Sequence, residues 1–387
     1  MALTAAEASS VKVANIVDGN VRLQVGERSA ELHALWLRDR SQEPGQIEET
    51  NRQRLFTPID LPADLRVTQC AVSDDALLLS FSDEHTARLE LAGIEIALGW
   101  RADPEEPPAP AAWTRPIEPF PYFEWDGIGW SSVEQDAARV VEFLGAFYRH
   151  GYVVLRNTPV AEGTVRRICD RLGYISGNNF GWTFDVRAES HPTDLAYTPI
   201  ALLAHTDQPY RQPVPGIQLL HCLRNEAPGG DSTLVDGLVA AQALAAHDPA
   251  AHAALVETQA EYRYDMGTDT VVGRGPVLEY DRSGRFRQIR LNTKIDAPLP
   301  RPDYDLDAFY RGRRWLTQRL NDPAHQATFR LEPGDVMFID NLRVLHGRTA
   351  FDSSQGVRHL QGAYIDHDGP DTMYRLAVRS LQTERPR

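Results

Sequence analysis

Two histidines and one aspartate are spaced so that they could hold a metal ion at an oxygen-activating centre. His205 and Asp207 lie together in the segment LLAHTDQPY, and His346 follows far downstream in FIDNLRVLHGRTAF. Two imidazoles and one carboxylate on adjoining strands form a facial cap, which leaves half of an Fe(II) coordination sphere open to a cosubstrate and to O2. Thiolates would instead favour zinc or iron–sulfur clusters. These three side chains are therefore the candidate ligands of Fe(II).

The surrounding residues decide whether this pattern is more than chance. The chain has 12 histidines, and an isolated His-x-Asp pair is more often a surface or core pair than a metal site. Here Pro209 ends the strand or starts a loop after the first pair, and His346 follows a turn signal and a β-rich run. Arg358 comes next, in the strand-like segment VRHLQGAY, and its guanidinium is a two-pronged donor for a carboxylate. The order of these side chains favours a functional site.

The elements that must position these residues fall into two parts. A proline-rich stretch at residues 102–125, ADPEEPPAPAAWTRPIEPFPYFEW, is predicted to be a linker, and we place the domain boundary there. Before it, within residues 1–101, the segments 11–26, 66–83 and 85–96 have the alternation of short strands with Asp-Gly and similar turns. A small N-terminal β-rich domain is therefore expected.

Residues 126–387 are predicted to form the larger domain. Apolar residues recur at helical spacing in the segments 131–150, 160–175, 236–258 and 303–323. Strand-like segments accompany them: HGYVVLRNTP, EYRYDM, PVLEYD, FRQIRL, ATFRLEPGDVMFID and RHLQGAYID. Helices around many short antiparallel strands indicate a mainly β fold with flanking helices, specifically a double-stranded β-helix or jelly roll. The three metal ligands would then stand on strand ends at its mouth.

The order of four motifs, HTD, GGDSTLVDG, FIDNLRVLHGR and RHLQGAYIDHD, resembles the Fe(II)/2-oxoglutarate dioxygenases, and among them the γ-butyrobetaine and trimethyllysine dioxygenase family. The resemblance covers nearly the whole chain. It implies Fe(II), 2-oxoglutarate and O2 as cofactor and cosubstrates, with His205, Asp207 and His346 as metal ligands. It also implies that Arg358 binds the distal carboxylate of 2-oxoglutarate, with Ser232 or Thr233 helping to hold that cosubstrate.

Aromatic residues bear on the substrate. Phe180, Trp182 and Phe184 stand close together in GNNFGWTFDV, and Tyr197 and Tyr364 lie near the expected metal ligands. Several aromatic faces around one cavity can bind a quaternary ammonium group, although buried aromatic residues are more often plain core. The resemblance implies that Phe180, Phe184, Tyr197 and Tyr364 occupy the positions of a trimethylammonium cage, with phenylalanine where eukaryotic relatives have tyrosine and tryptophan.

Four further positions bear on the other end of the substrate. Asp194 stands where the resemblance implies asparagine in γ-butyrobetaine dioxygenases and aspartate in trimethyllysine dioxygenases, so it favours an amine-bearing substrate; the alternative is a plain turn residue. Gln208 replaces the tyrosine or threonine that follows HTD in those relatives. Arg290 and Asn292, in RQIRLNTK, could hold an anionic head group, either carboxylate or phosphonate. The head group therefore stays open.

The same resemblance raises the question of a zinc site in the N-terminal domain. In the related dioxygenases clustered cysteines follow an LWLRD motif and bind zinc together with a later histidine. Here residues 35–39 match that motif, but the chain continues RSQEPGQIEETNRQRL without a cysteine. His85 alone cannot hold structural zinc, so no zinc is expected.

Composition limits the partners. The net charge of −14, without a basic run, disfavours a nucleic-acid or membrane-surface partner. The 3 cysteines lack a Cys-x-x-Cys spacing, and their odd number disfavours a disulfide framework, which suits a reducing cytoplasm. No segment is apolar enough for a bilayer span or a signal peptide. We expect a cytoplasmic protein with a small-molecule substrate, and the resemblance implies a homodimer.

The function predicted from these residues is Fe(II)- and 2-oxoglutarate-dependent hydroxylation of a C–H bond in a small trimethylammonium substrate. A γ-butyrobetaine-like compound would be hydroxylated, with succinate and CO2 as coproducts. The alternative substrates are trimethyllysine and 2-(trimethylamino)ethylphosphonate. Two other classes are a non-catalytic quaternary-ammonium-binding protein and a jelly-roll metalloprotein that performs hydrolysis or isomerisation.

Overall fold

The computed structural model describes residues 12–125, 136–188, 195–267 and 269–383. The chain divides into two compact units, Met1–Pro104 and Glu105–Arg387. Much of the proline-rich stretch after Pro104 is folded into the larger unit, where Trp113 is buried and its indole N–H donates to the carbonyl of His150 at 2.7 Å. No helix in the described part of the chain is long and apolar enough to cross a membrane.

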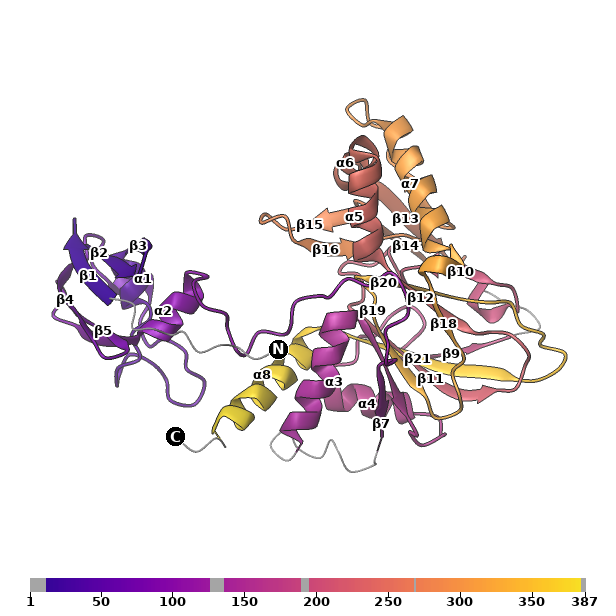
Figure 1. The fold of residues 1–387 in the computed structure, drawn as a ribbon, viewed down its shortest axis with the longest axis horizontal. Helices are drawn as coiled ribbons and strands as arrows, with labels where there is room; N and C mark the ends of the chain where they lie inside the picture. Colours follow the sequence, from indigo (N-terminus) through magenta and orange to yellow (C-terminus); the bar gives the residue numbers. More distant parts are fainter. Residues whose placement is uncertain (1–11, 126–135, 189–194, 268, 384–387) are drawn as a thin grey trace. The chain divides into compact units, whose positions relative to one another are not determined.

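The smaller unit consists of two three-stranded antiparallel sheets and short helices (Figure 1). Its elements are β1 (Lys12–Val17), β2 (Asn20–Val25), β3 (Arg28–Leu32), α1 (Ala34–Arg38), η1 (Pro58–Asp60), β4 (Val67–Ser73), β5 (Ala76–Phe81), β6 (Thr86–Glu90) and α2 (Leu91–Ala97). Alternate strand residues, such as Val21 and Leu23, enter one apolar core. In the β1–β2 turn Asp18 and Gly19 both have positive φ, as an Asp-Gly hairpin requires.

The segment 85–96 is a strand only in its first half. β6 ends at Glu90, and the residues from Leu91 onward form α2, so the prediction of a strand throughout this segment is wrong. Leu91 and Ile94, three positions apart, are the buried residues of the helix. Over so short a stretch the apolar residues fit a period of 2 and a period of 3.6 equally well, and packing against the core decides between them.

Two sheets form the centre of the larger unit (Figure 1). The six-stranded sheet has the order β7 (Tyr122–Glu124), β8 (Tyr152–Arg156), β19 (Val336–Asp340), β11 (Ile217–Asn225), β21 (Arg358–Ile365) and β9 (Thr183–Arg187). The four-stranded sheet has the order β10 (Leu202–His205), β20 (Val344–Arg348), β12 (Ser232–Asp236) and β18 (Ala327–Phe329). All neighbours pair antiparallel except β7 and β8. The described chain is thus mainly β in its central part.

The four central strands of the six-stranded sheet are buried on both faces, which explains their continuous apolar runs. In β8, Tyr152 and Val154 join residues of the four-stranded sheet, such as Leu234, in one core cluster. Val153 and Leu155 point the other way, into a cluster with three helices. These helices are α3 (Ala137–His150), α4 (Thr164–Leu172) and α8 (Asp368–Thr383). The two sheets therefore face each other, with helices behind the larger one.

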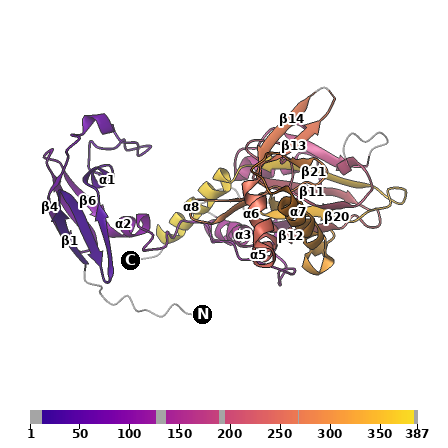
Figure 2. The ribbon, with the colours of Figure 1, turned by 90° about the horizontal axis from the view of Figure 1, so that it is seen from above.

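The remaining elements form a helical layer with small sheets (Figures 1 and 2). They are η2 (Leu195–Tyr197), α5 (Gly237–His247), α6 (Pro249–Glu257), β13 (Ala260–Asp265), β14 (Thr270–Gly275), β15 (Leu278–Tyr280), β16 (Phe286–Ile289), β17 (Asp296–Pro298), α7 (Leu306–Leu320) and η3 (Pro323–His325). The expected helical insertion at 236–258 is two helices, because Pro249 starts a new one whose N-cap Asp248 accepts a hydrogen bond from Ala251 N–H. Helices α5, α6 and α7 pack on one another, and β13 contributes residues to the same apolar core.

A half-buried histidine ties α8 to the six-stranded sheet. His367 directly precedes α8, and its Nε2 lies 3.4 Å from Oδ1 of Asp340 in β19. Burial alone would lower the pKa of His367, but the carboxylates of Asp340, Asp371 and Asp366 outweigh it and raise the pKa above the ordinary value. The protonated imidazole is therefore favoured in the folded protein.

His367 should stabilise the protein below about pH 6.5, the ordinary histidine pKa, and lose this contribution as the pH rises through its raised pKa. His367→Asn should accordingly lower the Tm at both pH values, and the loss at pH 6 should exceed the loss at pH 8.5 by roughly 2 °C or more. Thermal denaturation of both proteins across this range checks the difference. An effect of the same size at every pH would show that the histidine acts by packing alone.

Candidate metal centre and adjoining pocket

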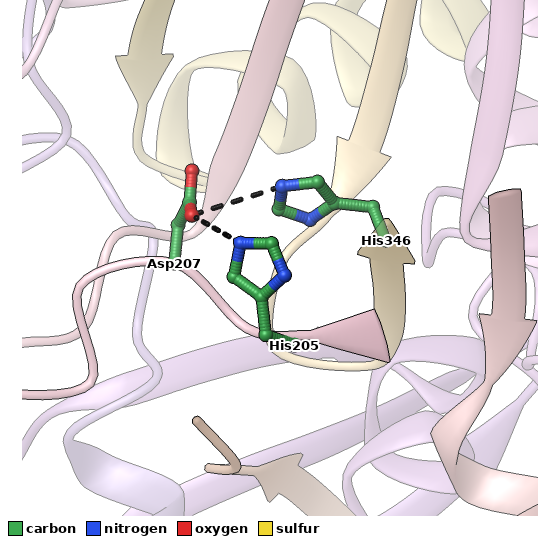
Figure 3. Close-up of side chains that lie close together, drawn as sticks. All are labelled: His205, Asp207 and His346. Carbon is green, nitrogen blue, oxygen red and sulfur yellow. Dashed lines mark ion pairs between the residues drawn. The ribbon is translucent and has the colours of Figure 1, made fainter. Parts of the chain in front are cut away.

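Strand pairing brings the two histidines of the predicted triad together. His205 ends β10 and is the antiparallel register partner of His346 in β20. Asp207 lies in the turn after β10, with Oδ1 3.3 Å from Nε2 of His205 and 3.7 Å from Nε2 of His346 (Figure 3). One ligand atom from each residue lies within 4.8 Å of the others. The sequence predicted that all three ligands would stand on strand ends. This prediction is wrong for His346, which lies in the middle of β20.

Neighbouring side chains fix the orientation of the Asp207 carboxylate. Gln218 Nε2 and the Tyr364 hydroxyl both donate to Oδ2, the latter at 2.6 Å. The carboxamide of Asn341 accepts from the backbone N–H of Asp207 at 2.7 Å and donates to its carbonyl at 3.1 Å. Because Oδ2 is held in this way, Oδ1 points towards the two imidazoles and can serve as a ligand atom.

The protonation states of the triad suit a metal ion. Nδ1 of His205 lies 2.8 Å from the carbonyl of Leu203, to which it can only donate, so in the neutral imidazole Nε2 has the lone pair. Burial lowers the pKa of His346 to about 4, which keeps its imidazole neutral at pH 7. Burial would raise the pKa of Asp207, but the histidines and the Tyr364 hydroxyl hold it below its usual range. Neutral imidazoles and an ionised carboxylate are the forms that bind a divalent metal.

A pocket of about 400 Å³ adjoins the triad and includes His205 and Asp207 in its lining. Five of its rings touch in series and form what we call the aromatic wall: Tyr210, Tyr264, Phe180, Phe184 and Tyr364. The centroid distances along this series are 4.9, 5.8, 6.2 and 5.3 Å. The aromatic wall ends at Tyr364, whose hydroxyl donates to Asp207. An apolar, electron-rich surface therefore leads directly to the candidate metal ligands.

The pocket gathers most of the residues expected to contact substrate. Four aromatic residues predicted for a cage line it, namely Phe180, Phe184, Tyr197 and Tyr364, as do Gln208 and Asn292. Sequence reasoning missed Tyr210, Tyr264 and Lys294, which also line it. The position of Tyr210 directly after HTDQP could have indicated that its ring lies near the metal ligands and lines the pocket. Tyr264 alternates with the buried Tyr262 in EYRYD, and nothing local separates a pocket residue from a core residue there.

Two residues expected at the substrate are absent from the lining of this pocket. Trp182 is 57% exposed and packs beside Gly177, with the Arg166 guanidinium 5.9 Å from its ring. The positive φ of the preceding Gly181, +104°, turns the backbone between Phe180 and Trp182. Their spacing of two therefore does not place these rings on one face.

Arg290 is buried behind the pocket instead of lining it. Its Nη1 donates to the carbonyl of Arg274 at 2.9 Å, and its guanidinium carbon lies 5.7 Å from the centroid of the Tyr262 ring. A Cβ on Gly275 would collide with that guanidinium, so this glycine makes room for it. Asp194, a third residue that was predicted to contact the substrate, lies outside the described residues.

The residues expected to hold 2-oxoglutarate lie along β12 and at the start of β21. Arg358 is 5% exposed, and its Nε donates to the carbonyl of Gly230 at 3.2 Å. Its terminal nitrogens make no hydrogen bond within the described residues. Ser232 and Thr233 begin β12, whose Leu234 is the register partner of His346. β12 thus begins two residues after Gly230, which lies beside Arg358, and leads to the partner of His346. None of the side chains of Arg358, Ser232 and Thr233 lines the aromatic pocket.

Comparison with known proteins was made with this geometry in hand. Residues 114–364 match the family described as taurine catabolism dioxygenase TauD, TfdA family. A γ-butyrobetaine dioxygenase from Pseudomonas sp. (strain AK-1) is 34% identical over 347 residues, 88% of this chain and 89% of that protein. A mitochondrial trimethyllysine dioxygenase from Gallus gallus is 30% identical over 86% of this chain and 80% of its own length. The human γ-butyrobetaine dioxygenase is 32% identical over 63% of this chain and 64% of its own length.

Proposed function

Because the chain belongs to the TauD/TfdA family of dioxygenases, we propose that it hydroxylates a C–H bond in a small trimethylammonium compound. It is an Fe(II)- and 2-oxoglutarate-dependent dioxygenase. With Fe(II), 2-oxoglutarate and O2 bound, O2 would be the oxidant: one of its oxygen atoms would enter 2-oxoglutarate, giving succinate and CO2, and the other would enter the C–H bond of the substrate. The protein's own contribution is to hold the reactants in order and to place one C–H bond next to the metal.

The metal is held by His205, Asp207 and His346 in this proposal. The donor set supports Fe(II), because it combines two neutral imidazoles with one carboxylate and includes no thiolate. Arg358 binds the distal carboxylate of 2-oxoglutarate. Its buried guanidinium has terminal nitrogens without a partner among the described residues, and such a guanidinium is completed by a carboxylate. Ser232 and Thr233 lie next to it on β12 and are assigned to the same cosubstrate.

The two facing sheets form a double-stranded β-helix in this proposal. Two observations support it: the sheets share one apolar core, and strands that follow one another along the chain alternate between them. β10, β12, β18 and β20 belong to the four-stranded sheet, while β11, β19 and β21 belong to the six-stranded sheet. Such alternation is typical of a jelly roll. A homodimer and a cytoplasmic location stay predictions from the sequence.

The observation that carries the substrate assignment is the aromatic wall beside the triad. A quaternary ammonium group cannot donate hydrogen bonds, so the faces of Phe180, Phe184 and Tyr197 provide its attraction in the pocket. Tyr364 stacks on Phe184 and donates to Asp207, so it joins the cage to the metal centre. A cation seated there would bring its neighbouring methylene groups towards the metal. The relatives named above act on γ-butyrobetaine and trimethyllysine, which both carry such a cation.

The test is anaerobic reconstitution with Fe(II) and 2-oxoglutarate, followed by the yield of succinate after exposure to air. The candidates are γ-butyrobetaine, trimethyllysine and 2-(trimethylamino)ethylphosphonate, with a sample that contains none of them. Stimulation by at least one supports the proposal. An iron–oxoglutarate absorbance band without stimulation by any candidate would contradict the substrate assignment while leaving the cofactors in place. A binding protein without catalysis would hold the substrate and release no succinate.

Tyr197→Ala should raise the KM for the trimethylammonium substrate by roughly 5- to 30-fold, because a desolvated cation–π contact contributes about 1–2 kcal/mol. It should also increase the ratio of succinate formed to substrate hydroxylated, since a loosely held substrate uncouples the two reactions. Trp182→Ala is the matched control, because that ring lies outside the pocket. Equal effects of the two substitutions would contradict the placement of the cage.

A further inference from the structure

One side of the pocket is formed by a segment that leads directly to the metal centre. It includes Tyr197 and the run 201–204, which ends next to His205. The segment begins in η2, but its described residues 198–201 belong to no helix or strand. Because backbone carbonyls that are not paired in a helix or sheet need other partners, the shape of such a segment depends on contacts from elsewhere in the chain. The direction of the Tyr197 ring depends on those contacts.

The guanidinium of Arg348 binds the backbone of this segment. Nη1 donates to the carbonyl of Ala196 at 2.9 Å, and Nη2 donates to the carbonyl of Thr198 and, at 3.4 Å, to that of Ile200. Arg348 is 6% exposed and is not among the described residues that line the pocket. The bound carbonyls lie before and after Tyr197. Because the donors of a guanidinium are held in a rigid plane, one side chain fixes the backbone on both sides of this tyrosine.

The same arginine belongs to the strand that contains a proposed metal ligand. Arg348 follows His346 by two positions in β20, so the two side chains lie on the same face of the strand. A second bond supports the attachment, since Phe351 N–H donates to the carbonyl of Pro199 at 3.1 Å. The Phe351 ring also packs on the arginine, with its centroid 5.1 Å from the guanidinium carbon. β20 and the residues that follow it therefore join the metal ligand to the segment of Tyr197.

We propose that Arg348 is a positioning residue that sets the place of the Tyr197 ring relative to the metal centre. The proposal rests on the function proposed above, which assigns this ring to the substrate cation. Arg348 lies outside the pocket lining and acts through the backbone of residues 196–200. One strand thereby holds both a metal ligand and the seat of the cation, so that the same C–H bond is presented in each turnover.

Fluorine NMR tests the attachment without substrate or turnover. A single 3-fluorotyrosine replaces Tyr197, and the protein is loaded with 2-oxoglutarate and with diamagnetic Zn(II) in place of iron. In Arg348→Gln the fluorine resonance should move at least halfway towards that of free 3-fluorotyrosine, because the freed backbone lets the ring sample several positions. An unchanged resonance in Arg348→Gln would overturn the proposal.

Steady-state kinetics measure the consequence for the substrate. Arg348→Gln should raise the KM for the trimethylammonium substrate by roughly 5- to 30-fold, as loss of the cation–π contact itself would. The ratio of succinate to hydroxylated product should rise by about twofold or more, while the KM for 2-oxoglutarate stays within about twofold. A general loss of structure would instead lower kcat through the fraction of active enzyme and leave both KM values unchanged, which would overturn the proposal.

Arg348→Lys is the second variant, and it decides the question if Arg348→Gln does not fold. Lysine keeps the charge, but its single ammonium group cannot reproduce the planar fork that binds several carbonyls. We expect the same pattern as in Arg348→Gln with smaller changes, namely a higher KM for the trimethylammonium substrate and more uncoupled succinate. Wild-type values of both quantities in a folded Arg348→Lys protein would contradict the positioning role.

Arg330→Gln is the matched control. Arg330 also donates to three backbone carbonyls, those of Asn225, Ala227 and Gly229. None of these described residues lines the pocket. The substitution should therefore leave the fluorine resonance in place and the KM for the trimethylammonium substrate within about twofold. Equal effects of Arg330→Gln and Arg348→Gln would show that loss of any such arginine disturbs the pocket, and the specific role of Arg348 would be wrong.

A double-mutant cycle tests whether Arg348 acts through Tyr197. In a Tyr197→Ala background, Arg348→Gln should change the KM for the trimethylammonium substrate by less than about twofold, because the ring that it positions is gone. Two independent effects that multiply would overturn the proposal.

Failure of the proposed function has a different signature. In that case no trimethylammonium compound stimulates succinate formation by the unmodified protein, and the fluorine resonance alone decides the role of Arg348. A displaced resonance in Arg348→Gln together with an unmoved one in Arg330→Gln supports the positioning of Tyr197. A resonance that stays in place in both variants overturns it.

Discussion

Replacing Asp207 with alanine should abolish both the retention of iron and the formation of succinate. Its Oδ1 is the only carboxylate oxygen within reach of both imidazoles in the described triad, at 3.3 Å and 3.7 Å. Without it two neutral histidines remain, which hold Fe(II) weakly and leave its charge unbalanced. Removal of a residue that hydrogen-bonds to a metal ligand lowers metal affinity by ~10–100-fold, and removal of the ligand itself should lower iron affinity by more than this. Iron content after gel filtration and the succinate rate measure the two effects.

Gln218→Leu is the matched control for this substitution. It removes one donor from Oδ2 of Asp207 and leaves every proposed ligand in place. We expect iron affinity to fall by ~10–100-fold, with turnover restored by added Fe(II). Added Fe(II) should therefore restore turnover in Gln218→Leu but not in Asp207→Ala. This difference distinguishes a metal ligand from a residue that only holds the ligand by a hydrogen bond. Full iron content and turnover in Asp207→Ala, with a native circular dichroism spectrum, would exclude the triad as the metal site.

Arg358→Gln should raise the KM for 2-oxoglutarate by roughly 10- to 150-fold, since a charge-assisted hydrogen bond contributes about 1.5–3 kcal/mol. The KM for the organic substrate should change little, because Arg358 lies outside the aromatic pocket. Glutamine keeps part of the side-chain volume next to Gly230, where a Cβ would come within 2.9 Å of the arginine side chain. Steady-state kinetics with each substrate varied in turn separate the two constants.

Arg224→Gln is the corresponding control. Arg224 lies in β11 near Arg358 in the strand register, but it is exposed and pairs with Glu226 at 2.9 Å. Its substitution should leave both constants within about twofold, since an exposed ion pair contributes at most ~1 kcal/mol. If Arg358→Gln instead weakened the organic substrate and spared 2-oxoglutarate, the assignment of this arginine would be wrong.

The grouping of His205, Asp207 and His346 was predictable because its signal does not depend on a single spacing. His205 and Asp207 stand where a strand gives way to a proline-containing turn, and His346 stands in a strand after a Pro-Gly-Asp turn, so local rules place each residue near a neighbouring strand. The family and its cofactors, inferred from the same motifs, are confirmed by the comparisons. The register that makes His205 the partner of His346 is a long-range pairing, which the sequence alone does not specify.

The pocket was predictable only in part, because its lining depends on backbone turns and on distant segments. Trp182 was expected beside Phe180, but the positive φ of Gly181 turns it outward. Arg290 was predicted to hold an anionic head group, yet its side chain reaches back to the carbonyl of Arg274, and Lys294, which was not predicted, lines the pocket. In both cases the residue type suited the expected role, and the direction of the side chain was decided by contacts outside its own segment.

The pairing of His205 with His346 also makes the reactive centre dependent on correct folding. β10 is an edge strand of its sheet, held on one side by β20 alone among the described strands. A slip of one residue between them would turn one imidazole to the opposite face and leave the other without its partner. Such a chain could not bring the three proposed ligands together, even if all its other strands and helices were correctly folded. On the proposed ligand assignment, a chain in which β10 is out of register with β20 would lack a complete metal site and would not activate O2.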